Sequence, residues 1–469
     1  MSAKRPKGCC MDVSIGQIIE AMGAQLLSGP REELSVGRVS TDTRSIERDA
    51  VFFALEGARF DGHDFLAEAV TKGARHLVVS NAKKVASELK KTANVLVVDD
   101  TLKAYGDLAK YYRQKFKVPA VAITGSTGKT TVKELVAHLL STRYQVLKNR
   151  GTENNLVGVP KTLLQINPAH EVLVLEMGTN YPGEIERLSS IIGPQIGVVT
   201  QIGHSHLEGL GSLEGVREEK LKLTRNLERG GILVLNGEDA MLQGVQSGVH
   251  RVLRVGFSEG CDWMAAQVWC HETGSSFRIS DDLFETQLIG RHNVLNCLIA
   301  LAVASSLGVE KAALQKALAA FRPVGGRMHL KCVEGIYFID DTYNSNPTSF
   351  TAALQTLKAL KIRERKGVVC GDMLELGDAT EAMHRQLGAL MAELLFDFVI
   401  AAGPRCAALV DEALKNGFDP SRIHHAKDSA EAGRLCRQIA GPGDRVLVKG
   451  SRSMQMEKVF ECFITSSIR

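Results

Sequence analysis

Short runs of aliphatic and β-branched residues alternate with segments of helical periodicity along most of the chain. The runs are apolar at consecutive positions, which predicts strands covered on both faces, as in a parallel sheet between helices. They lie at His76–Ser80, Val95–Val98, Ala120–Thr124, Val172–Glu176, Gly197–Thr200, Ile232–Leu235, Tyr337–Asp341, Val368–Gly371, Phe398–Ala401 and Arg445–Lys449. The pattern therefore predicts an α/β protein built on parallel sheets.

Two breaks divide this pattern into three α/β domains. The first break comes near residue 100, where a self-contained N-terminal segment ends and a connecting helix is expected over Asp99–Phe116. That N-terminal segment begins with a helix expected near Ile15–Leu27. The second is the Pro- and Gly-rich stretch Phe321–Arg327, which comes after two helices expected at Asn293–Leu307 and Lys311–Ala320. We therefore expect a small N-terminal α/β domain over residues 1–98, a central P-loop domain over residues 99–321 and a C-terminal Rossmann-like domain over residues 322–469.

The composition is that of an ordinary globular protein and indicates no macromolecular partner. Hydrophobic residues make up 44% of the chain and charged residues 23%, and the net charge of +4 is too small to favour nucleic acid or an anionic membrane. No apolar stretch is long enough to span a bilayer, and no signal-peptide pattern follows the tail Met1–Met11. Ten scattered cysteines without CxxC spacing indicate reduced thiols. We expect a cytoplasmic monomer.

A Gly-rich turn between a strand and a helix is the sharpest local signal. The segment Ala120–Thr131 reads AVAITGSTGKTT and leads into a helix expected over Val132–Leu140. Such a turn presents unpaired backbone N–H groups at a helix N-terminus, while Lys129 adds a positive charge and Thr130 a hydroxyl for Mg²⁺. Because Ile123 stands where the full pattern has Gly, this is a shortened P-loop for a nucleoside triphosphate; the alternative is a turn before an unrelated helix. The candidate residues are Gly125, Ser126, Thr127, Gly128, Lys129, Thr130 and Thr131.

Side chains at two further strand ends are candidates for metal ligands. Glu176 ends a predicted strand, and His204 and His206 follow the next one. Carboxyl ends of parallel strands meet at one edge of a sheet, where a carboxylate can hold a hard cation such as Mg²⁺ beside bound phosphates. The alternatives are a solvated helix cap for Glu176 and structural roles for the histidines. The later segment Gly209–Gly215 has the wrong spacing for a dinucleotide loop and is expected to be an ordinary loop.

Further motifs follow the P-loop in a fixed order. They are Thr152–Pro160 (TENNLVGVP), Glu176–Gly178 (EMG), His204–Gly209 (HSHLEG), Gly290–Asn296 (GRHNVLN) and Gly326-Arg327. Together with TGSTGKTT, this order resembles the Mur ligase family of ATP-dependent amide-forming enzymes. The resemblance spans the whole chain.

Six other segments resemble one kind of member within that family. They are Asp42–Arg44 (DTR), Phe52–Leu55 (FFAL), Asp61–His63 (DGH), Asp340–Pro347 (DDTYNSNP), Gly371–Gly377 (GDMLELG) and Lys449–Glu457 (KGSRSMQME). The resemblance is to members that join D-alanyl-D-alanine to UDP-N-acetylmuramoyl-tripeptide, the last cytoplasmic peptide-adding step of peptidoglycan precursor synthesis. The DNPR motif expected of the ligase that adds the third amino acid does not occur in this sequence.

The resemblance implies a three-domain α/β ligase that uses ATP and Mg²⁺. In this family, ATP phosphorylates a carboxylate to an acyl phosphate, and an amine then displaces phosphate through a tetrahedral intermediate. The resemblance implies binding of the UDP substrate by residues 1–98, of ATP by residues 99–321 and of D-alanyl-D-alanine by residues 322–469. It implies a function in cell-wall biogenesis, cell shape and cell division, with no nucleic-acid partner.

The resemblance also implies a role for each candidate at the phosphate site. Lys129 is expected to bind the β- and γ-phosphates, and Thr130 and Glu176 to hold one Mg²⁺. His206 is expected to join Glu176 at a second metal, with His204 as the fallback.

Other implied roles concern the nucleotides and the peptide substrates. Asn293 is expected to contact adenine, Asp341 to bind the ribose of ATP, and Arg327 to reach the γ-phosphate from the third domain. The remaining implied contacts are Asn155 for the nucleotide, Ser40, Thr43 and Arg44 for UDP, and Asn344 and Asn346 for substrate.

Lys220 lies in the segment Arg217–Lys222 (REEKLK). It aligns with a lysine that the family often carries as a carbamate, an anionic metal ligand formed with CO₂, and the resemblance therefore implies a catalytic and metal-binding role. Its neighbours depart from the small residues and Glu that are usual there. The alternative is a lysine on a helix face paired with Glu218 or Glu219.

Three rival functions share part of this pattern. A folylpolyglutamate ligase or another peptide ligase keeps the P-loop but is expected to lack the YNSNP and GDMLELG segments. A P-loop kinase transfers phosphate to a hydroxyl and stops there. The third rival is a nucleotide-binding scaffold without activity. The presence of Lys129, Glu176 and His206 argues against it, because a scaffold does not need these catalytic residue types.

Overall fold

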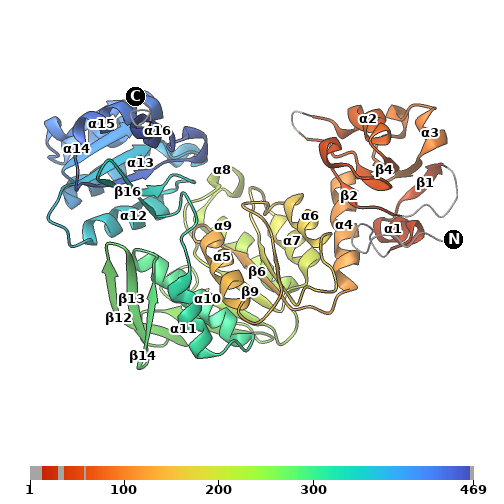
Figure 1. Cartoon of the computed structure of the whole chain (residues 1–469), viewed down its shortest axis with the longest axis horizontal. Coiled ribbons are helices and arrows are strands. Elements are labelled where there is room, and N and C mark those ends of the chain that lie inside the picture. Colours follow the sequence, from red (N-terminus) through yellow and green to blue (C-terminus); the bar gives the residue numbers. More distant parts are fainter. Residues whose placement is uncertain (1–12, 30–35, 58–59, 465–469) are drawn as a thin grey trace. The chain divides into compact units, whose positions relative to one another are not determined.

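The structure is a computed structural model that describes residues 13–29, 36–57 and 60–464 (Figure 1). The predicted tail Met1–Met11 lies outside these residues. Three sheets interleaved with helices confirm the α/β class, while the domain boundaries at residues 98 and 321 stay a prediction. By internal packing the chain divides into two compact units, the first made of Met1–Val118, Thr152–His170 and Ser190–Ile192, and the second of Pro119–Gly151, Glu171–Ser189 and Gly193–Arg469.

The first unit contains a five-stranded sheet in the order β1-β5-β4-β3-β2. Strands β2 to β5 are parallel, and β1 joins the edge antiparallel to β5. Phe52 of β3 packs in one core with α2, and Phe53 meets the ring of Tyr105 in α4 edge-on at 5.1 Å. The strands are β1 (Gln25–Ser28), β2 (Val39–Ser40), β3 (Ala50–Phe53), β4 (Ala74–Val79) and β5 (Asn94–Val97).

The predicted opening helix is shorter than expected. Helix α1 spans Ile15–Met22 and begins with a capping box between Ser14 and Gln17. It ends at Gly23, whose φ of 61° is left-handed and is tolerated because glycine has no Cβ. The apolar residues after Gly23 form β1, so the expected helix to residue 27 is wrong over its last turn.

The connecting helix expected before the P-loop is confirmed as α4 (Thr101–Gln114). It starts at Thr101 because the Asp100 side chain accepts hydrogen bonds from the backbone N–H groups of Leu102 and Lys103. The other helical segments of this unit are η1 (Thr43–Ser45), η2 (Gly62–Phe65), α2 (Leu66–Thr71), η3 (Ala82–Lys84), α3 (Leu89–Thr92) and α6 (Gly158–Leu163).

The second unit contains a nine-stranded sheet in the order β14-β13-β12-β11-β10-β9-β6-β8-β7. The pairs from β7 to β12 are parallel, which agrees with the predicted parallel sheet although β7 and β11 were not among the predicted strands, whereas β12, β13 and β14 are antiparallel. The antiparallel strands were not expected because their residues are alternately exposed and carry no continuous apolar run. The bounds are β6 (Ala120–Thr124), β7 (Val146–Lys148), β8 (Val172–Glu176), β9 (Ile196–Val199), β10 (Ile232–Asn236), β11 (Arg251–Gly256), β12 (Trp263–His271), β13 (Gly274–Ile279) and β14 (Asp282–Thr286).

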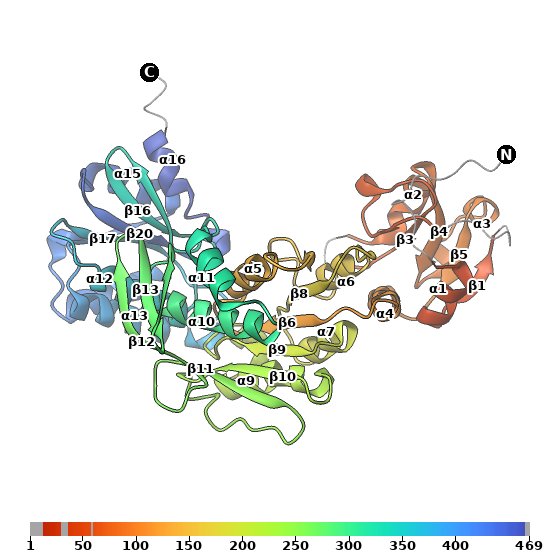
Figure 2. The same ribbon diagram turned by 60° about the horizontal axis from the view of Figure 1, so that its bottom comes forward.

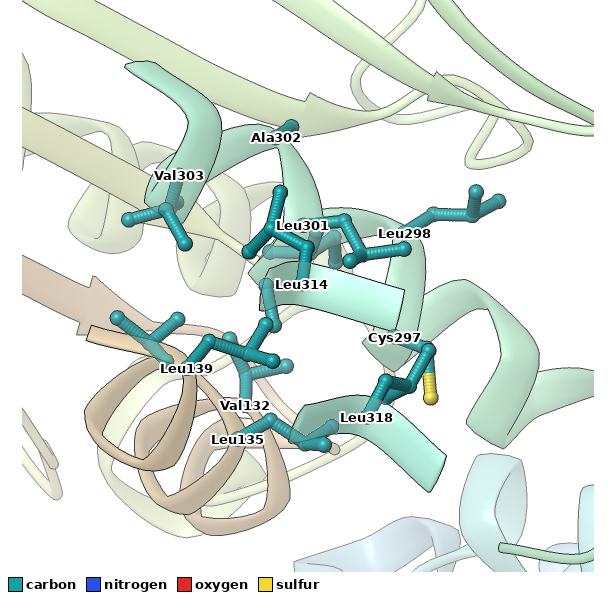
Figure 3. Packing of buried hydrophobic residues seen from close by; sticks show 14 of the residues in the cluster. Val132, Leu135, Leu139, Cys297, Leu298, Leu301, Ala302, Val303, Leu314 and Leu318 are labelled. Atoms are coloured by element: carbon teal, nitrogen blue, oxygen red, sulfur yellow. The ribbon is translucent and has the colours of Figure 1, made fainter. Parts of the chain in front are cut away.

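Three helices cover one face of this sheet: α5 (Lys129–Leu140), α10 (Arg291–Ser306) and α11 (Lys311–Ala320). In Figure 3, Leu135 of α5, Leu301 of α10 and Leu318 of α11 belong to one buried cluster. Each such leucine contributes about 1.5–3 kcal/mol through burial, so the cluster fixes the P-loop helix against the sheet. None of the helices in the described ranges has both the length and the apolarity that a membrane crossing requires.

The segment Gly209–Gly215 is not an ordinary loop. It contains the end of α8 (Leu207–Leu210) and the start of α9 (Leu213–Leu221), which begins where the Ser212 hydroxyl accepts a hydrogen bond from the Gly215 N–H. The remaining helices of this part are α7 (Glu184–Ile192) and η4 (Lys222–Asn226).

A six-stranded sheet follows in the order β15-β16-β20-β17-β18-β19 (Figure 2). All its pairs are parallel except the edge pair of β15 with β16. Helices α12, α13 and α14 cover one face and α15 and α16 the other, which is a Rossmann-like arrangement. The strands are β15 (His329–Val333), β16 (Ile336–Asp341), β17 (Lys366–Gly371), β18 (Phe398–Ala402), β19 (Ile423–Ala426) and β20 (Arg445–Lys449). The helical segments are α12 (Pro347–Ala359), η5 (Gly377–Ala379), α13 (Thr380–Leu394), α14 (Cys406–Lys415), η6 (Pro420–Arg422), α15 (Ser429–Ile439), η7 (Arg452–Met454) and α16 (Lys458–Ile464).

Candidate active site

The predicted P-loop joins the buried strand β6 to α5, and two of its positions admit only glycine. Gly125 has a φ of 145°, and a Cβ there would lie 1.9 Å from the Thr200 hydroxyl. Gly128 has a φ of 80°, and a Cβ there would lie 2.6 Å from Asn296 Oδ1. The loop therefore depends on glycine for its backbone conformation and for the close approach of its neighbours.

Side chains of the loop bind the chain that follows β9 and so fix the loop in place. The Ser126 hydroxyl accepts a hydrogen bond from Gly203 N and donates to the Gly203 carbonyl, both at 2.9 Å. The Thr127 hydroxyl donates to Gln201 Oε1 at 2.6 Å. Within the described part of the chain, the backbone N–H groups from Thr127 to Thr131 donate to no backbone acceptor. This fixed row of donors at the start of a helix can bind an anion such as a phosphate.

Lys129 is the first residue of α5, and its amine folds back over the loop. Nζ donates to the Gly125 carbonyl at 2.8 Å, and burial lowers the pKa of Lys129 from its ordinary value. The nearby Glu176 carboxylate opposes this shift. The amine therefore lies at the anion-binding turn, where a phosphate can take the place of the carbonyl contact.

Thr130, Glu176 and Arg327 form a linked set of contacts. The Thr130 hydroxyl donates to Glu176 Oε2 at 2.8 Å and accepts a hydrogen bond from Arg327 Nη2 at 2.8 Å. The Arg327 guanidinium also lies 4.1 Å from the ring centre of Tyr343, a favourable cation–π contact. Glu176 is only 1% exposed, so it is not the solvated helix cap that was the alternative.

The spacing of two oxygens in this set fits a magnesium ion. Mg²⁺ binds oxygen ligands at about 2.0–2.1 Å in an octahedron, so two neighbouring ligands lie about 2.9 Å apart. The Thr130 hydroxyl and Glu176 Oε2 are 2.8 Å apart. A hydroxyl and a carboxylate beside a phosphate loop are also the donor types that Mg²⁺ prefers.

Lys220 lies near the end of α9 and is 1% exposed. Burial, and secondly the charge of Lys129, lower the pKa of Lys220 well below its ordinary value. The adjacent Glu219 is held elsewhere, because it pairs with Lys222 at 2.7 Å and accepts hydrogen bonds from Gly183 N and Ile185 N. Lys220 is therefore a buried amine rather than a solvated lysine on a helix face.

His206 pairs with a residue that the sequence did not single out. His206 has a φ of 54° at the start of α8, and its Nδ1 lies 3.0 Å from Glu375 Oε2. The hydrogen bond from His206 lowers the pKa of Glu375. Groups of three closely spaced His, Cys or carboxylate side chains occur among the described residues, but none of them contains Glu176 or His206.

A cavity of about 330 Å³ lies beside the P-loop. It contains side chains of both charges, with Lys129 and Arg452 as cations and Glu375 as an anion. The Ser345 hydroxyl in its wall is buried and has no partner within the described residues. The lining residues are Ser126, Lys129, His204, Ser205, His206, Asn344, Ser345, Asn346, Leu374, Glu375, Ser451, Arg452 and Ser453.

Two strand ends of the C-terminal sheet carry a buried ion pair. Asp341 ends β16 and Lys449 ends β20, and their side chains meet at 2.6 Å. Lys449 Nζ also donates to the Asn344 carbonyl, and Asn344 Oδ1 accepts a hydrogen bond from Arg452 N. Asn346 caps α12. The ribose candidate Asp341 is thus linked through Lys449 to Asn344, one of the two asparagines predicted to bind substrate.

The adenine candidate Asn293 is buried at the start of α10. Its amide donates to the Ile289 carbonyl at 2.9 Å and accepts from Asn296, the residue that abuts Gly128 of the P-loop. Its neighbour His292 is partly buried, and the loss of hydration lowers the pKa of His292 to about 4. Asn293 is therefore tied through Asn296 to the phosphate turn.

The remaining candidates lie in the first unit. The Ser40 hydroxyl binds the Asp42 backbone, Thr43 is buried, and Arg44 is exposed and pairs with Asp42 at 2.7 Å. Asn155 Oδ1 accepts hydrogen bonds from the N–H groups of Val157 and Gly158 at the start of α6. The roles of these residues in binding stay predictions.

Three family profiles match the chain in sequence order. They are "Mur ligase family, catalytic domain" over residues 35–113, "Mur ligase middle domain" over residues 123–304 and "Mur ligase, glutamate ligase domain" over residues 326–452. The match covers all three sheets.

Full-length relatives agree with these profiles. A protein named UDP-N-acetylmuramoyl-tripeptide--D-alanyl-D-alanine ligase from Bacillus subtilis (strain 168) is 34% identical over 97% of this chain and 99% of its own length. One of the same name from Escherichia coli (strain K12) is 34% identical, with coverage of 96% and 98%. A crystal structure of MurF from Acinetobacter baumannii has a TM-score of 0.86 at 31% identity, covering 96% of this chain and 98% of that one. MurF ligase from Thermotoga maritima in complex with ADP has a TM-score of 0.81 at 28% identity, with coverage of 91% and 97%. This chain belongs to the Mur ligase family.

Proposed function

We propose that this protein is an ATP-dependent ligase that joins the amine of D-alanyl-D-alanine to the terminal carboxylate of UDP-N-acetylmuramoyl-tripeptide. The observation that carries the proposal is the cavity beside the P-loop. Ser126 and Lys129 of the phosphate turn line the same cavity as Glu375 and Arg452. An activated carboxyl phosphate and a zwitterionic amine substrate can therefore meet in one place.

The first step activates the carboxylate of the UDP substrate. A carboxylate oxygen attacks the γ-phosphorus of ATP, the bond to the β,γ-bridging oxygen breaks, and ADP leaves. The backbone N–H row of the P-loop and the Lys129 amine stabilise the negative charge on the phosphates, and Arg327 supplies a second cation at Thr130. The products of this step are an acyl phosphate and ADP.

The second step forms the amide bond. The neutral amine of the dipeptide attacks the acyl carbon, the tetrahedral intermediate collapses with loss of inorganic phosphate, and the nitrogen releases a proton. Water competes with the amine for the acyl phosphate, so the enzyme must hold the amine close and keep water out. The cavity of about 330 Å³ offers charged and polar groups that can hold the amine beside the phosphate loop.

Magnesium fits the oxygen pair of Thr130 and Glu176 described above. The ion, when bound, neutralises phosphate charge and polarises the γ-phosphate. We assign Thr130 and Glu176 to this ion, and His206 together with Glu176 and Lys220 to a second one. These side chains position the ion; Lys129 and Arg327 contribute their charges independently of it.

Lys220 is suited to carbamylation. A lysine must be neutral to attack CO₂, and burial, which lowers the pKa of Lys220, increases the fraction of that form. The reaction joins the amine nitrogen to the carbon of CO₂ and releases one proton. It converts the buried neutral amine into an anion, which attracts the nearby Lys129 and supplies an oxygen ligand.

The charges of the cavity match the dipeptide. The ammonium end of D-alanyl-D-alanine is expected to lie at Glu375, and its carboxylate at Arg452 beside Asn344. The unpartnered Ser345 hydroxyl offers a further hydrogen bond to the peptide group. The contacts of Asn293 and Asp341 with ATP, and of Ser40, Thr43 and Arg44 with UDP, belong to the same proposal. Its cellular role is cytoplasmic peptidoglycan precursor synthesis by a monomeric enzyme.

Product analysis tests the proposal. The protein is incubated with ATP, Mg²⁺, UDP-N-acetylmuramoyl-tripeptide and D-alanyl-D-alanine, and the products are identified by mass. The expected products are UDP-N-acetylmuramoyl-pentapeptide, ADP and phosphate in equal amounts. A stable phosphoester would identify a kinase. In a parallel incubation with ATP, Mg²⁺, a folate and glutamate, extension of the folate by glutamate would identify the rival ligase.

A further inference from the structure

Asn149 binds the backbone of Glu176 at both polar atoms. Asn149 Oδ1 accepts a hydrogen bond from Glu176 N, and Asn149 Nδ2 donates to the Glu176 carbonyl, each at 3.0 Å. Asn149 directly follows β7, and β7 pairs with β8 up to Lys148 and Val174. The side chain thus extends the sheet by one pairing beyond the end of β7. It fixes the backbone from which the Glu176 carboxylate projects.

Lys133 holds Asn149 in turn. Lys133 lies on α5, one turn after Lys129, and its side chain is fully buried. Its Nζ donates to the carbonyls of Asn149 at 2.9 Å and Gly151 at 2.7 Å, and it lies 3.0 Å from Glu134 Oε1. An ammonium group has three protons, and these three acceptors account for all of them.

The charge of Lys133 still acts on Glu176. Lys133 Nζ lies 3.9 Å from Glu176 Oε2, beyond hydrogen-bond distance but well within the range of a strong interaction between buried charges. A buried carboxylate without a nearby cation is costly. Lys133 thus stabilises Glu176 by its charge while its protons go to other acceptors, so it does not take a lone pair that a metal ion needs.

We propose that Lys133 and Asn149 are positioning residues that set the metal affinity of Glu176. Lys133 places a cation beside the buried carboxylate and holds Asn149 through its backbone carbonyl, and Asn149 fixes the Glu176 backbone. The inference rests on the proposed function, because it takes Glu176 as a ligand of Mg²⁺. Partners behind a metal ligand typically change metal affinity about 10–100-fold when removed.

Metal binding to the full-length protein tests this inference without an activity measurement. Mn²⁺ replaces Mg²⁺ as the probe, and its binding to the ADP-saturated protein is followed by the loss of the free Mn²⁺ electron paramagnetic resonance signal. Lys133→Met keeps the length of the side chain but removes its hydrogen bonds to the Asn149 and Gly151 carbonyls, which hold Asn149 against the Glu176 backbone. We therefore expect its Mn²⁺ affinity to fall about 10–100-fold. Asn149→Ser keeps the charge and removes the backbone contact, and we expect a loss in the same direction.

Lys148→Met is the matched control. Lys148 also pairs with Glu134, but it is 41% exposed on its side chain and has no contact with Glu176 among the interactions of the described residues. Its Mn²⁺ affinity should equal that of the wild type. In turnover assays, Lys133→Met should regain most of its kcat when Mg²⁺ is raised, which a general packing defect would not allow.

The measurements distinguish a failure of the role proposed for Lys133 from a failure of the assignment of Glu176 as a metal ligand. Wild-type Mn²⁺ affinity in folded Lys133→Met, or an equal loss in Lys133→Met and Lys148→Met, overturns the inference. If Lys133→Met does not fold, Lys133→Gln, which retains a hydrogen-bond donor without the charge, decides by the same criteria. Glu176→Gln tests the underlying assignment separately. Wild-type Mn²⁺ affinity in that variant would contradict the role of Glu176 as a ligand, irrespective of Lys133.

Discussion

Arg327 Nη2 donates a hydrogen bond to the Thr130 hydroxyl at 2.8 Å, although the two residues are 197 positions apart in the chain. The same hydroxyl donates to Glu176. Arg327 therefore lies at the end of the P-loop where the phosphates of ATP are proposed to bind.

Replacing Arg327 should slow the chemical step. In Arg327→Ala, we expect kcat to fall about 10²–10³-fold, the usual loss for one preorganised charge that stabilises a transition state. The KM for the UDP substrate should change much less, because we assign that substrate to the first unit. Steady-state kinetics with each substrate varied in turn measure both. Arg322→Ala, an exposed arginine five residues earlier, is the control, and a variant with normal kcat would remove Arg327 from the site.

Loss of Lys220 should be repaired by a small acid. Lys220→Ala should abolish most ligation, and formate or acetate at high concentration should restore part of it by supplying the missing carboxylate oxygen. Lys222→Ala, which removes only the partly exposed partner of Glu219, should be mild. Equal defects in both variants, or no rescue of a folded Lys220→Ala protein, would count against the carbamate.

The lowered pKa of Lys220 also predicts a pH dependence of stability. Between the lowered pKa of the folded state and about 10.4, the unfolded chain binds a proton at this lysine that the folded chain does not. The free energy of unfolding therefore rises with pH in this window, by up to about 1.4 kcal/mol per pH unit. Lys220→Met lacks this contribution.

In CO₂-free buffer we expect Lys220→Met to be more stable than the wild type at pH 7, because a buried amine is costly. That advantage should shrink as pH rises from 7 to 9. Urea unfolding of both proteins at each pH measures it, with Lys222→Met as the reference. A difference that stays constant with pH would mean that Lys220 titrates as an ordinary lysine.

The cavity charges predict a selective loss of dipeptide binding. Glu375→Gln should raise the KM for D-alanyl-D-alanine about tenfold, the effect of losing one charge-assisted hydrogen bond of about 1.4 kcal/mol. The KM for ATP should be unaffected. Glu381→Gln removes a carboxylate that pairs with Arg385 on α13 and should leave both constants unchanged. A rise in KM for ATP alone would place Glu375 at the nucleotide instead.

The strands that carry the site were predictable, because each is a continuous apolar run. Three of them, β6, β8 and β20, have the predicted bounds. The antiparallel strands β12 to β14 were not predicted, because strands that are exposed on one face resemble loops in composition. The end of α1 was misplaced because Leu26 and Leu27 continue the apolar pattern beyond Gly23, and only the left-handed backbone at Gly23 separates helix from strand.

The site was predictable where chemistry follows a local motif and not where it depends on distant contacts. Lys129, Thr130 and Glu176 stand at a loop or a strand end that the sequence marks. Lys133 looks like one more polar residue of an amphipathic helix, and only the fold brings its amine to the carbonyls of Asn149 and Gly151. The one feature of the sequence that could have indicated a role for Lys133 is its position one helical turn after Lys129. Glu375 lies inside the GDMLELG motif, but its pairing with His206 joins segments 169 positions apart in the chain and could not be predicted from that motif.

The proposed mechanism requires that ATP activate the peptide carboxylate as an acyl phosphate before the amine attacks. The direct measurement uses UDP-N-acetylmuramoyl-tripeptide labelled with ¹⁸O in its terminal carboxylate, together with ATP, Mg²⁺ and D-alanyl-D-alanine. We expect each molecule of inorganic phosphate released with an amide bond to carry one ¹⁸O atom from the carboxylate. Amide formation with unlabelled phosphate would contradict it, as would phosphate transfer without an amide product.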